Sequence, residues 1–324
     1  MNPAILIFSL ALAVPSAAMA FPFSGASGKK AAEQLGAMRS VFAKGDCAAV
    51  QEIFTALELP GGPMREEAYG YAGQCYEKGG LTDKAINLYK LALGLYPENT
   101  FFAARLADIY NESGFYESAA ILFLKILALR KDDVGANLGL ARAYSRLGFL
   151  ARAREFYSRT AALQNFAVPQ VMREYAACLL KQRNWEAAAA VNAKGAAAEP
   201  GEAFWPLMSA RTLAGQGKYL EAVSAMEAAV RLAPSRQRRL ERAMYLLLGG
   251  RPALAIEAAD AELAAGGSDP FAASVKALAL YAMGEKKKAE PYFSAAAAGK
   301  TFTGKLAAAF LAAGGNGGQS ACKK

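Results

Sequence analysis

The sequence predicts an all-α solenoid of about eight helix-turn-helix repeats followed by a C-terminal capping helix. Its first support is a period of about 34 residues, with units beginning near residues 31, 66, 100, 134, 169, 203, 236 and 270. Its second support is glycine at the fifteenth place of seven of the eight units, in a chain with only 30 glycines among 324 residues; Arg183 is the exception. Its third is a small residue, usually alanine, at the eighth and twentieth places. Self-similarity at such a period is typical of a helical array.

Each unit reads as two amphipathic helices. Apolar residues at helical spacing precede and follow the fifteenth place, and glycine there accepts the left-handed backbone that ends the first helix. Small residues at the eighth and twentieth places let the two helices approach closely. Pro97, Pro200 and Pro234 end second helices, because the proline ring clashes with the preceding turn. Pro291 lies within the second helix of the eighth unit and predicts a kink or break there.

The ends of the chain differ from the array. Residues 1–20 predict a cleaved signal peptide, because an apolar run from Ala4 to Val14 is followed by Pro15 and a small-residue cleavage site. Eleven apolar residues are too short to span a bilayer. We expect a linker at 21–30, the array at 31–303, a capping helix at 304–314 and a flexible tail at 315–324. If residues 1–20 are not cleaved, the protein is instead a membrane-anchored or cytosolic adaptor.

The fixed glycine, alanine and proline places together resemble the tetratricopeptide repeat (TPR) family, over roughly residues 31–303. The tryptophan that the family carries at the fourth place is missing, and Tyr69 is its nearest substitute. The resemblance implies a right-handed superhelix whose first helices line a concave face. It also implies a non-enzymatic scaffold that binds a peptide or a protein. Export would place that scaffold in the periplasm or cell envelope, where it would serve the assembly of an envelope complex.

Composition excludes several kinds of site. The chain contains no histidine, which removes the commonest general base and the commonest metal ligand. The Gly299-Lys300-Thr301 sequence ends a helix and lacks the first glycine of a phosphate-binding loop. We therefore predict no catalytic residues, no metal and no cofactor. The net charge of +9 favours acidic partners, and an exported protein would not normally meet chromosomal DNA, so we expect no nucleic acid. Membrane contact is expected only with an uncleaved N-terminal segment.

The candidate binding groove follows from the resemblance, which implies that the second, fifth, ninth, twelfth and thirteenth places of first helices face the concave side. The side chains at these places that suit a partner are Phe101, Asp108, Arg142, Ser145, Arg146, Arg173, Lys181, Phe204 and Arg211. Guanidinium groups suit carboxylates and aromatic faces suit apolar side chains. The predicted ligand is an acidic segment with hydrophobic residues. Alternatively, the arginines pair internally with Asp108 or Glu174, or the partner docks on the arginine cluster at 236–242.

The four cysteines allow one disulfide. Cys47 is expected early in the second helix of the first unit and Cys75 late in the first helix of the second unit. These helices should pack antiparallel, so the two residues should lie close together, although neighbours need not have disulfide geometry. Cys178 is predicted to be a buried apolar residue, and Cys322 falls in the tail.

Overall fold

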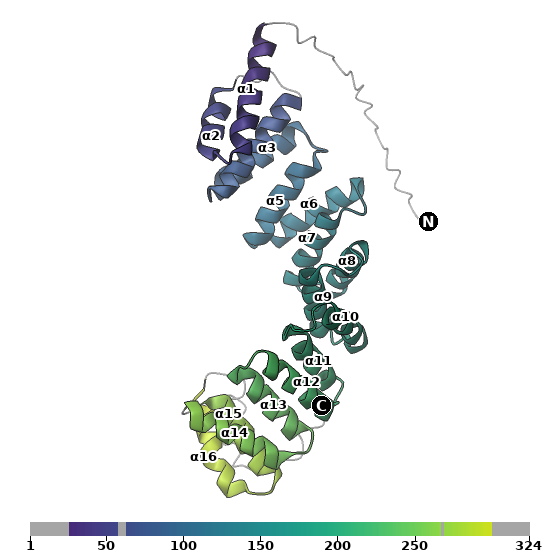
Figure 1. The fold of residues 1–324 in the computed structure, drawn as a ribbon, viewed down its shortest axis with the longest axis vertical. Coiled ribbons are helices and arrows are strands. Elements are labelled where there is room, and N and C mark those ends of the chain that lie inside the picture. Colours follow the sequence, from purple (N-terminus) through teal and green to yellow (C-terminus); the bar gives the residue numbers. More distant parts are fainter. Residues whose placement is uncertain (1–25, 58–62, 267–268, 300–324) are drawn as a thin grey trace, which may run out of the picture. The chain divides into compact units, whose positions relative to one another are not determined.

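The computed structural model describes residues 26–57, 63–266 and 269–299, and within them it contains sixteen α-helices and no strand (Figure 1). The first helices of the repeats are α1 (Ala26–Ala43), α3 (Pro63–Lys78), α5 (Thr100–Glu112), α7 (Val134–Arg146), α9 (Pro169–Lys181), α11 (Phe204–Gly215), α13 (Arg236–Leu248) and α15 (Pro270–Ala282). The second helices are α2 (Cys47–Ala56), α4 (Thr82–Leu95), α6 (Tyr116–Leu129), α8 (Leu150–Leu163), α10 (Trp185–Ala198), α12 (Tyr219–Leu232), α14 (Pro252–Gly266) and α16 (Lys286–Ala297). The predicted all-α repeat fold is confirmed.

The turn inside each repeat has the predicted backbone. All seven glycines at the fifteenth place have positive φ, from 69° at Gly80 to 85° at Gly114. Arg183, which replaces glycine in the fifth repeat, adopts the same conformation with φ of 56°. The hydrogen bond that closes the turn is also kept there, since the Asn184 amide donates to the Leu179 carbonyl at 3.0 Å. The turn is therefore built without glycine at this one repeat, against the steric preference of a residue that carries a Cβ atom.

The chain divides into two compact units, one ending at Phe102 and the other beginning at Ala103. In the first unit α1, α2 and α3 pack against one another, and α3 packs against α4. In the second unit each helix from α6 to α16 packs against the next one along the chain. First helices of neighbouring repeats also meet, as α9 does with α11 and α13 with α15. Within the second unit the buried residues form more than one cluster, and one of them extends from α11 to α15.

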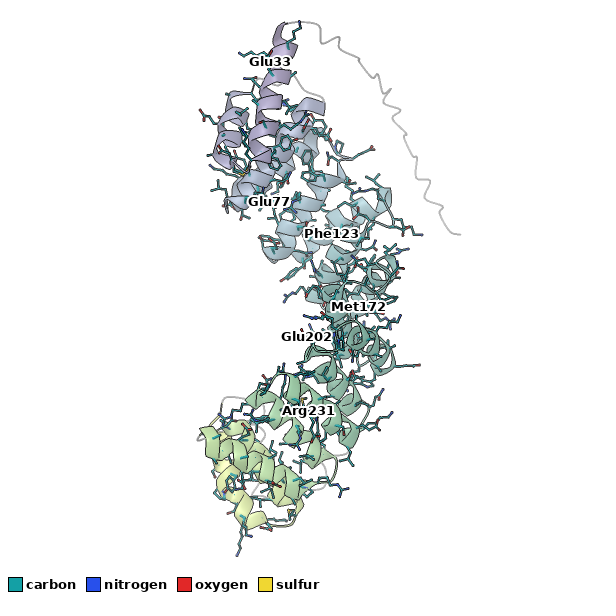
Figure 2. All side chains as sticks on the ribbon, in the orientation of Figure 1. Glu33, Glu77, Phe123, Met172, Glu202 and Arg231 are labelled. Atoms are coloured by element: carbon teal, nitrogen blue, oxygen red, sulfur yellow. A yellow bond between two sulfur atoms is a disulfide. The ribbon has the colours of Figure 1, made fainter. Side chains whose placement is uncertain are left out.

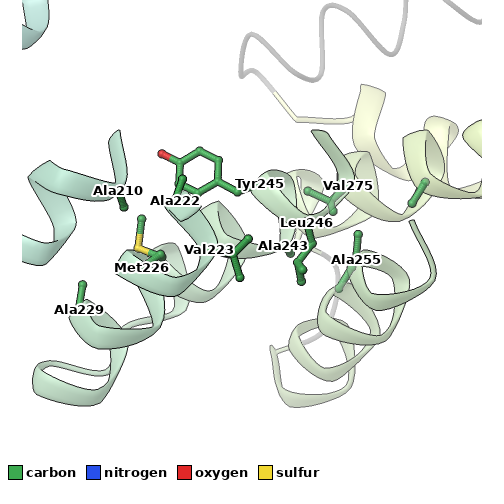
Figure 3. Close-up of a cluster of buried hydrophobic side chains, with 12 residues drawn as sticks. Ala210, Ala222, Val223, Met226, Ala229, Ala243, Tyr245, Leu246, Ala255 and Val275 are labelled. Carbon is green, nitrogen blue, oxygen red and sulfur yellow. The ribbon is translucent and has the colours of Figure 1, made fainter. Parts of the chain in front are cut away.

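In the core, large side chains pack against small residues of the neighbouring helices. Phe123 and Met172, labelled in Figure 2, are both buried. A Cβ atom placed on Gly139 would lie 2.2 Å from the Phe123 ring, so only glycine leaves room for that ring. Figure 3 shows a C-terminal part of the core, where Met226 lies near Ala210, Ala222 and Ala229 of its own repeat. Small residues thus allow helix axes to come close while one large side chain fills each gap.

Two local expectations need correction. The linker predicted at 21–30 is too long, because α1 begins at Ala26 and includes Lys29 and Lys30, a lysine- and alanine-rich stretch that favours helix. The break predicted at Pro291 is wrong, because α16 continues through it from Lys286 to Ala297. Pro291 is exposed, and a proline ring there removes one hydrogen bond of the helix without disturbing its buried face. The signal peptide, the capping helix at 304–314, the tail and Cys322 lie outside the described residues.

Cys47 and Cys75 are joined by a disulfide in the structure, with their Cα atoms 5.1 Å apart. The bond links the start of α2 to the end of α3, and so ties the first repeat to the second. Cys178 is a buried free thiol, and burial raises its pKa. No helix among the described residues is both long enough and apolar enough to cross a bilayer.

Candidate functional site

The candidate site is a hollow of about 800 Å³ in the second unit, which we call the groove hollow. It lies on the first helices α5, α7 and α9, with contributions from Tyr116 and Tyr157. Five of the residues predicted to line the groove meet in it: Asp108, Arg142, Ser145, Arg146 and Lys181. Residues that the family resemblance assigned to the groove thus lie around one space on three consecutive first helices, α5, α7 and α9.

Arg142 is held inside this hollow by a neighbouring repeat. Its Nε and terminal nitrogen each donate a 2.8 Å hydrogen bond to the two carboxylate oxygens of Glu174, which also accepts from Gln170 at 2.8 Å. The Glu174 side chain is only 20% exposed. Burial alone would raise the pKa of Glu174, but the hydrogen bonds from Arg142 and Gln170 outweigh it and lower the pKa below its ordinary value. The hydrogen bond to Glu174 in turn raises the pKa of Arg142.

Two other predicted arginines pair in the same way outside the groove hollow. Arg211 makes two hydrogen bonds to Glu241, at 2.9 and 3.0 Å. Arg173 makes two 2.9 Å hydrogen bonds to Glu199. The expectation of an open basic groove is therefore wrong for these three arginines, because carboxylates from neighbouring repeats or loops already occupy them. The alternative of internal pairing applies instead. Glu174 is the partner that was predicted, whereas Glu199 and Glu241 were not predicted.

The aromatic edges of the predicted groove also lie elsewhere. Phe204 packs against Trp205 and lies beneath the Arg173 guanidinium, 5.6 Å from it. Phe101 belongs to the first unit, where it lines a separate hollow of about 330 Å³ with Glu66 and Glu67. Neither phenylalanine lines the groove hollow.

Comparison with known proteins supports the repeat assignment. Residues 66–99 and 207–270 each match a family model described as a tetratricopeptide repeat. The chain therefore contains tetratricopeptide repeats in these two segments. A TPR protein from Parabacteroides merdae has a similar fold, with a TM-score of 0.53 and 16% identity, over 78% of this chain and 99% of that one. YrrB, also a TPR protein, aligns with a TM-score of 0.50 and 18% identity over 53% of this chain and 88% of its own.

One relative is similar in sequence. Superkiller protein 3 of Schizosaccharomyces pombe is 31% identical over 99 residues, which are 31% of this chain and 7% of the relative. The match therefore spans only a small part of that protein's length.

The hollow also contains two residues that the sequence analysis did not name. Asn111 occupies the twelfth place of its repeat and Gln170 the second place, and both line the groove hollow. The Asn111 side chain donates a 2.9 Å hydrogen bond to the Gly139 carbonyl. Its Oδ1 atom is buried and accepts no hydrogen bond among the described residues. The same rule of places would have found both residues.

The groove hollow retains two unpaired cations. Arg146 and Lys181 are exposed and form no ion pair within the part of the chain that the structure describes. Both occupy the thirteenth place of their repeats, on α7 and α9. They offer two positive charges to a ligand, and two such cations suit a carboxylate-bearing segment.

The arginine cluster at 236–242, weighed as another docking patch, is largely paired. Arg239 donates to Glu262, whose side chain is only 7% exposed. Arg236 lies 3.3 Å from Asp269, and Arg242 lies 2.8 Å from Glu227. These ion pairs favour the interpretation that the cluster is a solvated helix face whose charges are balanced within the chain, rather than a docking patch. The described residues hold no group of three or more potential metal ligands.

Proposed function

We propose that this TPR protein is a non-catalytic scaffold that holds an extended segment of a partner protein in the groove hollow. Arg146 and Lys181 carry the proposal, because these exposed cations line the hollow and form no ion pair within the described part of the chain. YrrB, whose fold is similar, is described as having an unusual peptide-binding site, which supports the same use of this fold.

The proposed ligand is acidic and carries hydrophobic residues. Its carboxylates would pair with Arg146 and Lys181, and its apolar side chains would contact Leu138 and the ring of Tyr116, which line the same hollow. The ligand would enter a surface of mixed charge, because Asp108 and Glu112 also line the hollow. Specificity would therefore come from where the positive charges lie along the groove rather than from a uniformly basic surface.

We further propose that the protein is exported and acts in a cell-envelope complex. The apolar run from Ala4 to Val14 and the cleavage site after it support this proposal. Mass spectrometry of the protein from its native source would locate the mature N-terminus. A start at Phe21 supports export, whereas an intact N-terminus favours the anchored or cytosolic adaptor.

The groove is tested by charge reversal at the unpaired cations. Arg146→Glu combined with Lys181→Glu should abolish enrichment of the specific partner that the wild-type protein captures from envelope extract. Lys125→Glu combined with Lys218→Glu is the matched control, since both lysines are exposed and lie outside the groove hollow. The variant Arg142→Glu is not used, because its carboxylate would repel that of Glu174 and the result would report on folding rather than on binding. Equal capture by both double variants, with unchanged helicity, would remove the site from this groove.

A further inference from the structure

A second hollow in the second unit is not part of the concave face. It has a volume of about 1130 Å³ and lies where the turns of two successive repeats, α7–α8 and α9–α10, come together. We call it the turn-edge hollow. Its lining includes the side chains of Phe149, Arg152, Arg154, Arg183, Trp185 and Gln216. The hollow shares no residue with the groove hollow.

The turn-edge hollow is positively charged and its charge is not compensated. Three arginines line it against one carboxylate, Glu186. Arg154 and Arg183 are exposed and form no ion pair among the described residues, and Arg152 lies over the ring of Tyr144 at 5.5 Å. By contrast, the arginines of the predicted groove that lie on α7, α9 and α11 in mid-helix are each paired with a glutamate. The fold thus neutralises these three mid-helix arginines and leaves Arg154 and Arg183 open.

The backbone adds to the same charge. Helix α8 begins at this hollow, and its N-cap residue Phe149 makes no side-chain capping hydrogen bond. Its first turn contains no acidic residue, as is also true of α2, α14 and α16, whereas α4, α6, α10 and α12 each carry one there. The positive end of a helix dipole favours an anion, and in α8 neither a capping side chain nor a carboxylate of the first turn provides that negative charge. An anionic ligand could therefore provide it.

Arg183 is held in this position against its backbone preference. Its φ of 56° is the conformation that glycine provides in the other seven repeats. A side chain raises the energy of that conformation, and glycine at this place would avoid the penalty. Backbone strain of this kind is often kept where the side chain serves a function. At Arg183 the strained backbone places a guanidinium at the turn-edge hollow.

Two aromatic rings complete the surface. Phe149 is 55% exposed, as Phe115 is at the same place of the third repeat, where the exposed fraction is 57%. The Trp185 ring packs directly over Gly215, and a Cβ atom at that position would lie 2.6 Å from the ring. This contact holds the ring in place. Guanidinium groups beside aromatic faces suit a ligand with both carboxylates and an apolar side chain.

We propose that the turn-edge hollow binds an acidic segment of a partner protein that carries at least one aromatic residue, with its carboxylates on Arg154 and Arg183. An inorganic anion would leave Phe149 and Trp185 uncovered. A membrane plane would not enter a concave surface between two turns. The segment is distinct from the one proposed for the groove hollow, and the two sites can be occupied at once because they share no residue.

The test uses a fluorescein-labelled peptide of sequence Glu-Glu-Asp-Phe-Glu-Phe-Asp and measures its affinity for the full chain by fluorescence anisotropy. The wild type should bind it, and rising salt should weaken that binding. Arg154→Ala and Arg183→Gly should each weaken binding at least tenfold. Arg183→Gly should at the same time raise the thermal midpoint, so lost binding would not reflect lost folding. Arg231→Ala is the matched control and should leave the affinity unchanged, because this exposed arginine lies on α12, outside the hollow.

Two further arms separate the sources of an anionic ligand and the two sites. Phosphatidylglycerol vesicles and inorganic phosphate should not compete with the peptide at physiological ionic strength. The variant with both Arg146→Glu and Lys181→Glu should still bind the peptide, since those residues belong to the groove hollow. The proposal is overturned if the wild type does not bind, if Arg154→Ala and Arg183→Gly bind as well as the wild type, or if vesicles or phosphate displace the peptide.

Discussion

Gly73 offers the sharpest test of how the repeats pack. It lies in the interior of α3, and a Cβ atom there would meet the Tyr89 ring, with distances of 2.3, 2.5 and 2.7 Å to Cε1, Cζ and Oη. The ring cannot easily move away. Tyr89 is fully buried, its hydroxyl donates a 2.5 Å hydrogen bond to Glu77, and Phe102 packs against it with ring centroids 6.0 Å apart. Restoring an ordinary contact near 3.4 Å would require a shift of about 1 Å.

The expected magnitude follows from two opposing effects. Alanine is favoured over glycine inside a helix by about 1 kcal/mol. Overpacking a tight core site costs roughly 1–3 kcal/mol. Gly73→Ala should therefore lower the free energy of unfolding by about 0–2 kcal/mol, and Gly73→Leu should lower it further because more atoms must be accommodated. Urea unfolding followed by far-ultraviolet circular dichroism, with hydrogen exchange of α3 and α4, measures the change.

Gly36→Ala is the matched control. Gly36 lies inside α1 of the same unit, is exposed, and has no atom within 4 Å of a Cβ placed on it. The control should gain the full helix preference of about 1 kcal/mol, so the difference between the two alanine variants isolates the packing effect at roughly 1–3 kcal/mol. If Gly73→Ala stabilises the protein as much as Gly36→Ala does, the proposed role of Tyr89 in fixing the helix separation is incorrect.

Three further predictions concern a crosslink, a titration and a proline. Reduction of the Cys47–Cys75 disulfide should lower the free energy of unfolding by about 3 kcal/mol on the chain-entropy account, and equal urea midpoints with and without reductant would contradict it. The pKa values of Glu67 and Glu174 are lowered in the folded state, so these groups stabilise it above the ordinary carboxyl pKa of 4.5, and that stabilisation should be lost as the pH falls through the folded pKa values. Urea midpoints measured from neutral to acidic pH should decline, and less so in Glu174→Gln; a flat profile in the wild type argues against the linkage. Pro291→Ala should raise stability by up to about 3 kcal/mol, since it restores a helical N–H and removes a ring clash, and thermal melts with an unchanged midpoint would show that α16 has already adapted to proline.

The fold was readable because its rules are local. The turn requires a residue with a left-handed backbone conformation, and glycine at a fixed place predicts that turn in seven repeats. At Arg183 the glycine is absent, yet the turn still forms. The 34-residue period therefore predicted this turn better than the residue type did. Pro291 shows the converse, because a local rule predicted a break and packing of Phe293 and Ala296 kept the helix.

The lining of the groove hollow was readable for the same reason, since helical register decides which places share a face. The partners of the arginines were not. Arg142 and Glu174 are 32 residues apart, and Arg211 and Glu241 are 30 apart, on first helices of successive repeats. Whether two such side chains meet depends on the angle and spacing between repeats, which no local pattern encodes.

The disulfide between α2 and α3 has a consequence for where the array opens. In a solenoid each repeat is stabilised by its neighbours, and a terminal repeat has only one, so ends fray first. Within the described residues α1 contacts only α2 and α3, yet the Cys47–Cys75 bond secures that end covalently. The last described pair, α15 and α16, contains no cysteine. Oxidation should therefore protect α1 and α2 from fraying, whereas in a reducing compartment these two helices would unfold more readily. The redox state of the compartment would set how many repeats are folded at one time.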